Sequence, residues 1–594
     1  MKNLLALLCA ITLCTQPAAA RRSQSEMRQL AARQLARINS RHSTTAEASE
    51  AAVKSNADGR QSIDELIAMD HLAVYGNDEG YVVVNAETVM SPILGYSTRS
   101  LKADRLPCGM QWWLRGIDDA IHVRLMSPGV MAEAEHRTFT PVNNFLKAKW
   151  GQEDPYNALC PKVNGTLPPC GCLATAMAQV LYYYRYPQQG KGKGWYTLGQ
   201  SASHINANIS STYDWDHIYD TYKGAIDDAK RIPVATLLRD CGYGVNMAYN
   251  VDGSGAYSSS CAASLIDNFS YAPQSLRYYN RQFFSSDEWM DMIQQELLAG
   301  RPVLYGGSDS SYGGHAFIFS GINADGLVYV NWGWNGDSDG YYDIRSLNPT
   351  GILGISSVFA FTEGQSMIIG IKPTADATDT AVDNYLAIDE VFRVKKFGST
   401  SLQLVGGRVY NLGYRDFTGE IGFLFLSDDG DDAKTTYYKA YDNTTGEAIR
   451  VGYPIEITSK LQNIKALPAG SYHIYMVAQN VGAERRELMR GQGGICRYAF
   501  TKDADGSITL GESEILDAIR DIRFDDNVHG HSGSDSSHRT GSGSSAADDA
   551  VTRIYDTSGN LVYSSPTPQF NLWDVNTHGI LVIKQGNQVR KVVR

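Results

Sequence analysis

Two residues with clear chemical potential stand out: a cysteine at the start of an apolar run and a histidine at the start of a strand. Cys172 follows the rigid segment Pro168–Gly171, and the apolar run behind it predicts a helix over Leu173–Tyr186 that stops at Pro187. Unpaired N–H groups and the positive dipole end at a helix N-terminus stabilise a thiolate. The sequence therefore predicts a nucleophilic thiol at Cys172, with a small buried core cysteine as the alternative.

A thiol nucleophile needs a base, and residues 141–373 contain three histidines. His204 and His217 lie in polar, tyrosine-rich segments, which indicate surface or hydrogen-bonding roles. His315 follows two glycines and opens a predicted strand, His315–Ser320, that would hold the imidazole rigidly. His315 is therefore the candidate base.

A second predicted strand, Leu327–Trp332, returns beside the first and would bring Asn331 next to His315. An asparagine carbonyl that accepts the imidazole N–H would hold the ring in the tautomer that serves the thiol, with Trp332 and Trp334 shielding the bond from water. The alternative interpretation of Asn331–Trp334 is an aromatic turn packed on the core.

The strings GCLATAMAQ around Cys172 and GGHAF to VNWGWNGDSDGYY between Gly313 and Tyr342 resemble the streptopain family of secreted cysteine peptidases, which includes interpain-type enzymes. The resemblance implies that Cys172 is the nucleophile, His315 the general base and acid, Asn331 the residue that orients the imidazole, and Trp332 the cover of the His–Asn contact. It also implies that Gln152 forms the oxyanion hole with the N–H of Cys172.

The fold implied by this resemblance is α+β and papain-like, with the cysteine-bearing helix packed on a twisted antiparallel sheet that bears the histidine. Residues 138–373 would form this peptidase domain. Its glycine- and serine-rich stretch Asp252–Ser260 is a candidate wall of the substrate pocket or an ordinary surface loop. No cofactor and no metal are expected.

Residues 21–137 are expected to form an α+β propeptide. The patterns predict a helix over Arg21–Asn39, strands over Gly80–Asn85 and Ser91–Tyr96, and a short helix over Met110–Ile117. The polar stretch Met126–Thr140 predicts an exposed connection that proteases can reach. The resemblance implies a zymogen inhibited by its own propeptide, with protein or peptide substrates and a preference for an apolar side chain two residues before the scissile bond.

Length and charge agree with a multidomain exported protein. The 594 residues suggest several modules, and 53 basic against 64 acidic residues give a net charge of −11, which disfavours nucleic-acid backbones and anionic membranes. Residues 1–20 have the layout of a cleavable secretory signal. A secreted or outer-surface location is therefore expected.

The C-terminal part has three predicted segments. Alternating strand patterns over residues 374–524 predict an Ig-like β-sandwich, residues 525–550 a flexible linker, and residues 551–594 a small β domain. The last segment resembles the sorting domain of type IX secretion cargo through Tyr555–Val562 and Lys591–Arg594, which implies secretion machinery as a partner; a plain β-hairpin domain is the alternative. An acidic turn is a candidate calcium site or a solvated loop; its carboxylates are Asp428, Asp429, Asp431 and Asp432.

Of nine cysteines, two lie in the signal, which leaves 9 − 2 = 7. Cys172 has to be free, and Cys108 and Cys496 fall in other modules. A bridge of Cys170 to another cysteine, with Cys160 as the candidate, and a pairing of Cys241 with Cys261 are favoured over a metal or redox site at the pair Cys170 and Cys172.

The leading hypothesis is therefore a secreted cysteine endopeptidase made as a zymogen. The alternatives are a surface adhesin that keeps a peptidase-like scaffold and binds host proteins, and a transglutaminase-like acyl transfer on the same residues.

Overall fold

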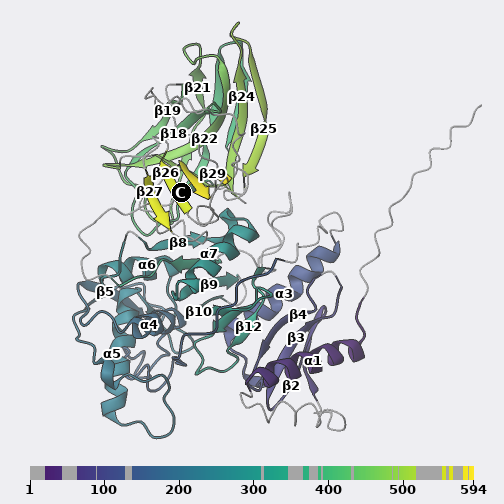
Figure 1. Ribbon diagram of the computed structural model, residues 1–594. Helices are drawn as coiled ribbons and strands as arrows, with labels where there is room; N and C mark the ends of the chain where they lie inside the picture. Colours follow the sequence, from purple (N-terminus) through teal and green to yellow (C-terminus); the bar gives the residue numbers. More distant parts are fainter. Residues whose placement is uncertain are drawn as a thin grey trace, which may run out of the picture.

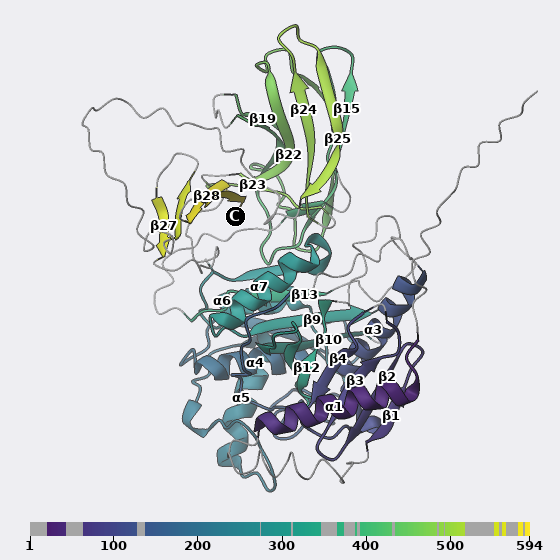
Figure 2. The same ribbon diagram turned by 45° about the vertical axis from the view of Figure 1, so that its right-hand side comes forward.

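The computed structural model describes three successive units and a small terminal sheet (Figures 1 and 2). We call them the N-terminal unit (residues 21–126), the central unit (residues 137–373) and the β unit (residues 386–516). The described residues are 21–42, 63–88, 90–126, 137–273, 275–309, 313–345, 365–373, 386–388, 392–429, 434–483, 486–491, 494–516, 552–556, 561–565, 580–585 and 588–593. The predicted signal and the predicted 525–550 linker lie outside them.

A ten-stranded antiparallel sheet runs from the N-terminal unit into the central unit, in the order β1-β2-β3-β4-β12-β11-β10-β9-β13-β8. Its strands are β1 (Asp64–Ala68), β2 (Leu72–Asn77), β3 (Gly80–Asn85), β4 (Ile93–Ser97), β8 (Arg277–Asn280), β9 (Val303–Asp309), β10 (Gly313–Ile322), β11 (Val328–Asn331), β12 (Gly340–Tyr342) and β13 (Ser366–Ile369). The two units meet in one ladder, where Tyr96 and Gly95 of β4 pair with Tyr341 and Tyr342 of β12. One sheet thus links the expected propeptide directly to the expected peptidase.

In the N-terminal unit, two helices cover opposite faces of β2–β4. Helix α1 (Gln24–His42) lies across the strands in Figure 1. Its apolar side chains pack with Val82 and Val84 of β3. Helix α3 (Cys108–Met126) packs with Tyr81 and Val83 on the other face. The run Gly80–Asn85 is therefore buried on both faces, which explains its continuous apolar sequence.

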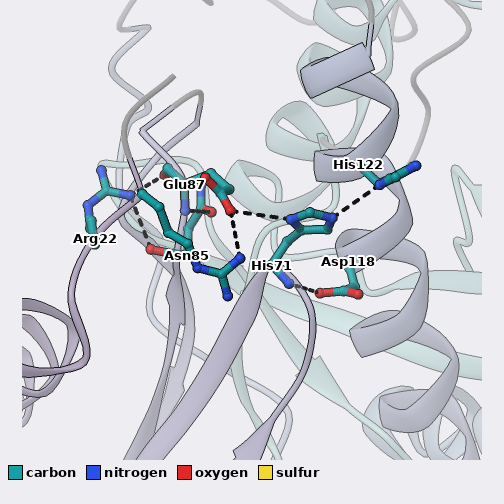
Figure 3. Close-up of polar contacts among 7 residues, drawn as sticks. Arg22, His71, Asn85, Glu87, Asp118 and His122 are labelled. Carbon is teal, nitrogen blue, oxygen red and sulfur yellow. Dashed lines mark hydrogen bonds and ion pairs between the residues drawn. The ribbon is translucent and has the colours of Figure 1, made fainter. Parts of the chain in front are cut away.

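Helix α3 is longer than the predicted helix Met110–Ile117 because polar residues in its second half are paired (Figure 3). Asp118 accepts a hydrogen bond from the backbone N–H of His71 at 2.8 Å, and the rings of His71 and His122 contact through nitrogens 3.2 Å apart. His71 also contacts Glu87, which pairs with Arg21. This network fixes α3 to the sheet and to the start of the N-terminal unit.

In the central unit, the two faces of β10 contribute to two cores. Ala316 and Ile318 belong to the core that surrounds α4, whereas Phe317 and Phe319 pack with α3 and α7. The helices are α4 (Cys172–Tyr184), α5 (Asp228–Gly244), α6 (Ser258–Asp267) and α7 (Ser286–Leu298), and a small sheet contains β5 (Lys193–Leu198), β6 (Ile205–Asn208) and β7 (Ala248–Tyr249). The expected packing of the cysteine-bearing helix on an antiparallel sheet is present.

The predicted disulfides are wrong. All seven cysteines in the described part of the chain are free thiols. Cys160, Cys170, Cys241 and Cys261 are buried side chains of the core around α4, and burial raises the pKa of Cys160 to about 12. These thiols fill apolar space as small core residues, and Cys170 Sγ lies 3.3 Å from the hydroxyl of Thr175.

The predicted exposed connection Met126–Thr140 is only partly described. Helix α3 extends to Met126, and residues 127–136 lie outside the described part. Phe139 is buried, and its N–H donates to the carbonyl of Ala324 at 3.0 Å. The C-terminal end of the predicted connection is therefore part of the central unit's fold.

The β unit consists of antiparallel strands around one main core. They are β14 (Leu386–Ile388), β15 (Arg393–Phe397), β16 (Ser401–Val405), β17 (Gly407–Asn411), β18 (Gly419–Ser427), β19 (Thr436–Asp442), β20 (Pro454–Ile457), β21 (Lys460–Asn463), β22 (Gly470–Asn480), β23 (Glu487–Leu488), β24 (Ile495–Lys502) and β25 (Ile508–Leu516). The terminal sheet has the order β27-β26-β28-β29, with β26 (Thr552–Asp556), β27 (Leu561–Ser565), β28 (Ile580–Gln585) and β29 (Gln588–Val593). Within the described residues, no helix has the length and apolarity that a membrane crossing requires.

The acidic turn of the β unit uses its described carboxylates in ion pairs. Asp428 lies 2.5 Å from His473 Nδ1, and Asp429 pairs with Lys434. Asp431 and Asp432 lie outside the described residues. Among the residues that are described, no group of three or more His, Cys, Asp or Glu side chains has the arrangement of a metal site.

The β unit contacts the central unit through α7. Arg490 makes a two-pronged ion pair with Glu288, with nitrogen to oxygen distances of 2.7 and 3.1 Å, and its guanidinium lies over the ring of Phe284. Helix α7 lies on the side of the central unit that faces the β unit (Figures 1 and 2). A second, more exposed pair joins Arg415 to Asp267 at the end of α6.

Candidate active site

Cys172 is the first residue of α4, as the sequence predicted. Gly171 caps the helix with a φ of 92°, and a Cβ at this position would lie 2.6 Å from Met247 Cε, so only glycine fits. The backbone N–H of Ala316 donates to Cys172 Sγ at 3.4 Å. The thiol is therefore held between a helix N-terminus and strand β10.

His315 lies on β10 and is 4% exposed. Its Nε2 is 3.0 Å from the carbonyl oxygen of Trp332, and its Nδ1 is 3.1 Å from Cys108 Sγ of the N-terminal unit. Because a carbonyl can only accept, Nε2 carries a proton, and Nδ1 is the nitrogen left to exchange a proton with a thiol.

Cys172 and His315 shift each other's ionisation. Burial opposes ionisation of the Cys172 thiol, but the charge and hydrogen bonding of His315, with the N–H groups of Ala316 and Leu173, outweigh it and lower the pKa of Cys172. Burial likewise disfavours the imidazolium, yet the interactions with Cys172 and Cys108 raise the pKa of His315 well above its ordinary value. The site therefore favours a thiolate–imidazolium pair.

The predicted contact between Asn331 and His315 is absent, because the register of β10 and β11 places Asn331 opposite Ile318. Asn331 Nδ2 donates to the carbonyl of Ala148 at 2.7 Å, and its Oδ1 accepts the N–H of Gly333 at 3.0 Å. The Gly333 N–H and the Trp332 carbonyl belong to the same peptide group, and that carbonyl accepts the hydrogen bond from His315 Nε2. Asn331 is therefore linked to the imidazole through one peptide group and does not contact it directly.

Trp332 is fully buried and covers the histidine side of the site. Its ring centroid lies 4.8 Å from that of Phe317, and its indole N–H donates to the carbonyl of Ser338 at 3.0 Å. Trp334, which the sequence also suggested as a shield, is 38% exposed. Only the first of the two tryptophans therefore excludes water here.

Gln152 lies beside the segment that leads into α4. Its carbonyl accepts the N–H of Cys170 at 2.8 Å, two residues before Cys172. The neighbouring stretch Asp252–Ser260 is also close, because the hydroxyl of Ser254 donates to the carbonyl of Pro169 at 2.6 Å. Both segments therefore contact the residues that directly precede Cys172.

The other two histidines have separate partners. His204 stacks on Trp195 with ring centroids 3.8 Å apart, and His217 Nδ1 is 2.8 Å from a carboxylate oxygen of Asp214. His315 is therefore the histidine of this set that the fold brings to the thiol.

Two residues at the start of α3 were missed by the sequence analysis. Cys108 contacts the imidazole, and a Cβ on Gly109 would lie 2.2 Å from His315 Cδ2 and 2.8 Å from Trp332 Cε3. Trp112, one turn later, packs against Gly307 of β9 so closely that a Cβ on this glycine would lie 2.4 Å from Trp112 Cζ2. No spacing signal links Cys108 to His315, since 207 residues separate them.

Known proteins match both halves of this arrangement. A model of the peptidase C10 family matches residues 150–342, and a model of the Spi protease inhibitor matches residues 21–121. Streptopain of Streptococcus pyogenes is 31% identical over 315 residues, which cover 50% of this chain and 78% of that protein. The chain belongs to the peptidase C10 family.

Two further similar proteins are a curated relative and a solved structure. The thiol protease/hemagglutinin PrtT of Porphyromonas gingivalis is 29% identical over 51% of this chain, which spans only 36% of that longer protein. The solved structure of Prevotella intermedia prointerpain A is 35% identical and covers 53% of this chain and 99% of that one, with a TM-score of 0.47. The two family models and the streptopain match together make this C10 protein a streptopain-like cysteine peptidase whose N-terminal unit is an inhibitor-like propeptide domain.

Proposed function

We propose that this protein is a secreted cysteine endopeptidase, made as an inactive zymogen, that hydrolyses peptide bonds of proteins through an acyl-enzyme on Cys172. The observation that carries the proposal is the placement of a thiol at the N-terminus of α4 beside His315 on a rigid strand, with a lowered thiol pKa.

In the proposed reaction, the Cys172 thiolate attacks the scissile carbonyl and forms a tetrahedral intermediate. The side-chain amide of Gln152 and the N–H of Cys172 stabilise its oxyanion. The His315 imidazolium then protonates the leaving amine as the carbon–nitrogen bond breaks, which leaves a thioester. A water molecule that gives a proton to His315 hydrolyses the thioester and restores the thiolate.

The orientation of His315 rests on a backbone carbonyl instead of the side-chain amide expected from sequence. The Trp332 carbonyl receives the Nε2 proton, which leaves Nδ1 for the thiol. Asn331 supports this carbonyl through the N–H of Gly333, and a hydrogen bond on one side of an amide strengthens that on the other. Asn331 is therefore proposed as a positioning residue.

Latency follows from the same geometry. Cys108 Sγ lies 3.1 Å from Nδ1, the nitrogen that the mechanism assigns to Cys172, and Gly109 fits against the ring so closely that no side chain could replace it. The N-terminal unit thus competes with the nucleophile for its base. Cleavage within residues 126–140 is proposed to release that unit.

The remaining proposals concern export and specificity. Residues 1–20 would direct export, residues 551–594 would engage secretion machinery, and the Ig-like β-sandwich of residues 374–524 would be an accessory domain. The four-stranded sheet β27-β26-β28-β29 is consistent with a separate terminal domain. The stretch Asp252–Ser260 would line the pocket for an apolar side chain two residues before the scissile bond, since Ser254 ties it to the segment before Cys172.

The test compares wild type with Cys172→Ala, both without residues 1–20, and uses Cys496→Ala as a matched loss of a buried thiol in the β unit. Wild type and Cys496→Ala should trim themselves between residues 126 and 140 and digest casein, whereas Cys172→Ala should do neither. If all three proteins stay full length and remain inert after limited trypsin treatment, the proposed function is wrong.

A further inference from the structure

Trp332 is held by hydrogen bonds at three points, and two of them come from adjacent residues of the loop after β11. The Trp332 backbone N–H donates to Asp339 Oδ1 at 3.0 Å, and its indole N–H donates to the Ser338 carbonyl at 3.0 Å. Its own carbonyl receives His315 Nε2 at 3.0 Å. A continuous path of hydrogen bonds and one residue's backbone therefore runs from Asp339 to the catalytic imidazole.

Asp339 is an unusual residue for a purely structural loop. It is 3% exposed, and its Oδ2 has no hydrogen-bond partner within the described part of the chain. A buried carboxylate with one unsatisfied oxygen is costly and is rare unless it serves a function. A neutral acceptor would satisfy the Trp332 N–H without that cost.

Burial and the neighbouring charges both shift the pKa of Asp339. Burial raises the pKa of Asp339 to about 7, while the Trp332 N–H and the positive charges of Lys149 and Arg99 oppose the rise and Asp337 adds to it. The other ionisable groups that face it are the phenols of Tyr81, Tyr329 and Tyr342. Arg99 belongs to the N-terminal unit, which also binds this loop because the Ser97 hydroxyl donates to the Asp339 carbonyl at 2.6 Å.

We propose that Asp339 is a positioning residue for His315: its carboxylate fixes the backbone of Trp332, and its negative charge stabilises the imidazolium that the thiolate requires. This inference rests on the proposed peptidase function. It adds to the Cys172 and His315 pair a buried acid that never touches substrate and acts through the Trp332 backbone. Asn331 accepts a hydrogen bond from the Gly333 N–H, and Asp339 accepts one from the Trp332 N–H. Asn331 and Asp339 therefore fix the backbone on both sides of the Trp332 carbonyl, which accepts the hydrogen bond from His315 Nε2.

The expected pH effect has a defined sign. A charged Asp339 favours the imidazolium, so the alkaline limb of kcat/KM, where His315 loses its proton, lies at higher pH than it would without that charge. A variant that loses the charge of Asp339 but keeps a hydrogen-bond acceptor there should therefore have its alkaline limb at lower pH, by about one unit.

The experiment uses the full chain without residues 1–20, matured by limited trypsin that is then inhibited. The variants are Asp339→Asn, which keeps an acceptor of the same shape, Asp339→Ala, which removes it, and Asp337→Asn, an acid of the same loop whose side chain is 51% exposed. With a small peptide substrate, kcat should fall by roughly tenfold in Asp339→Asn and by roughly a hundredfold in Asp339→Ala, with KM within twofold of wild type. Asp337→Asn should match wild type.

The pH profile separates positioning from a merely structural role. A structural role predicts fewer active sites, which titration with an alkylating peptide would count, and an unchanged alkaline limb. A wild-type alkaline limb in Asp339→Asn overturns the inference, and so does a loss confined to KM. If wild type itself is inert, the proposed function has failed instead, and the two failures are thereby distinguished.

Discussion

The central unit forms one interface with the N-terminal unit and another with the β unit, and only the first contacts His315 within the described residues. The N-terminal unit shares a sheet with it through β4 and β12, and the start of α3 contacts the imidazole of His315. The β unit contacts the N-terminus of α7 and the end of α6 through ion pairs, without reaching Cys172 or His315 in the described residues. The proposed mechanism requires the first junction to break, because it ends on the imidazole that the mechanism uses, whereas the second can persist.

This difference shows how one protein can be both latent and durable. The inhibitory junction depends on close fit at two glycines, because Gly109 lies against His315 and Gly340 lies against the backbone carbonyl of Tyr96. Two residue pairs also join β4 to β12 in the sheet. The lasting junction includes a charge pair in which the Glu288 side chain is 3% and the Arg490 side chain 14% exposed, and Tyr414 and Ala387 of the β unit also pack in the cores of the central unit. Substitutions at each junction should therefore have effects of different kinds.

The largest effect is expected at the β-unit junction. Arg490→Met leaves the Glu288 carboxylate buried without its partner and should reduce the free energy of unfolding by about 3 kcal/mol, measured by urea denaturation. Glu288→Gln combined with Arg490→Met should recover part of the loss, because both charges of the pair are then removed. Arg415→Gln, in a more exposed pair, should cost less than about 1 kcal/mol. A tenfold fall of kcat/KM in mature Arg490→Met would contradict the comparison.

A smaller effect is expected from a methyl group placed between the strands of the other junction. A Cβ on Gly340 would lie 2.4 Å from the carbonyl oxygen of Tyr96 and 3.0 Å from Ser97 Cβ, both in the N-terminal unit. Gly340→Ala should weaken the docking of that unit by about 2 kcal/mol and speed trimming of the zymogen by trypsin roughly thirtyfold. Mature Gly340→Ala should keep kcat/KM within twofold of wild type. Unchanged trimming would show that the ladder does not hold the zymogen together.

The smallest effect is expected from the thiol that competes for His315. Cys108→Ala removes the contact with Nδ1, so iodoacetamide should label Cys172 of the zymogen about tenfold faster, as followed by mass spectrometry of the Cys172 peptide. Cys496→Ala serves as the control for the loss of a buried thiol. Labelling at the wild-type rate in Cys108→Ala would mean that Gly109 and Trp112 alone provide latency.

Local patterns predicted the elements that carry the nucleophile and base. The predicted strand Gly80–Asn85 has the bounds of β3, and the predicted helix Leu173–Tyr186 overlaps almost all of α4. The predicted strand His315–Ser320 lies within β10. These succeed because apolar runs bounded by proline or glycine determine short elements without reference to the rest of the chain.

The failures all depend on distant parts of the chain. The predicted direct contact of Asn331 with His315 is absent from the structure because strand register, which the sequence left open, sets which residues face each other. The end of α3 was missed because His71, which pairs with Glu87, contacts Asp118 and His122 in its polar second half from another element (Figure 3). The disulfides were wrong because spacing does not reveal that a thiol fills a core. Cys108 and Asp339 could be found only from geometry.

The ladder between β4 and β12 has one further consequence. In the zymogen, Tyr341 and Tyr342 of β12 have strand neighbours on both sides. When the N-terminal unit departs, β12 becomes an edge strand whose free backbone groups can pair with another extended chain. Removal of the N-terminal unit would therefore create a new sheet edge at Gly340–Tyr342, and the mature enzyme would have to keep that edge from pairing with other copies of itself.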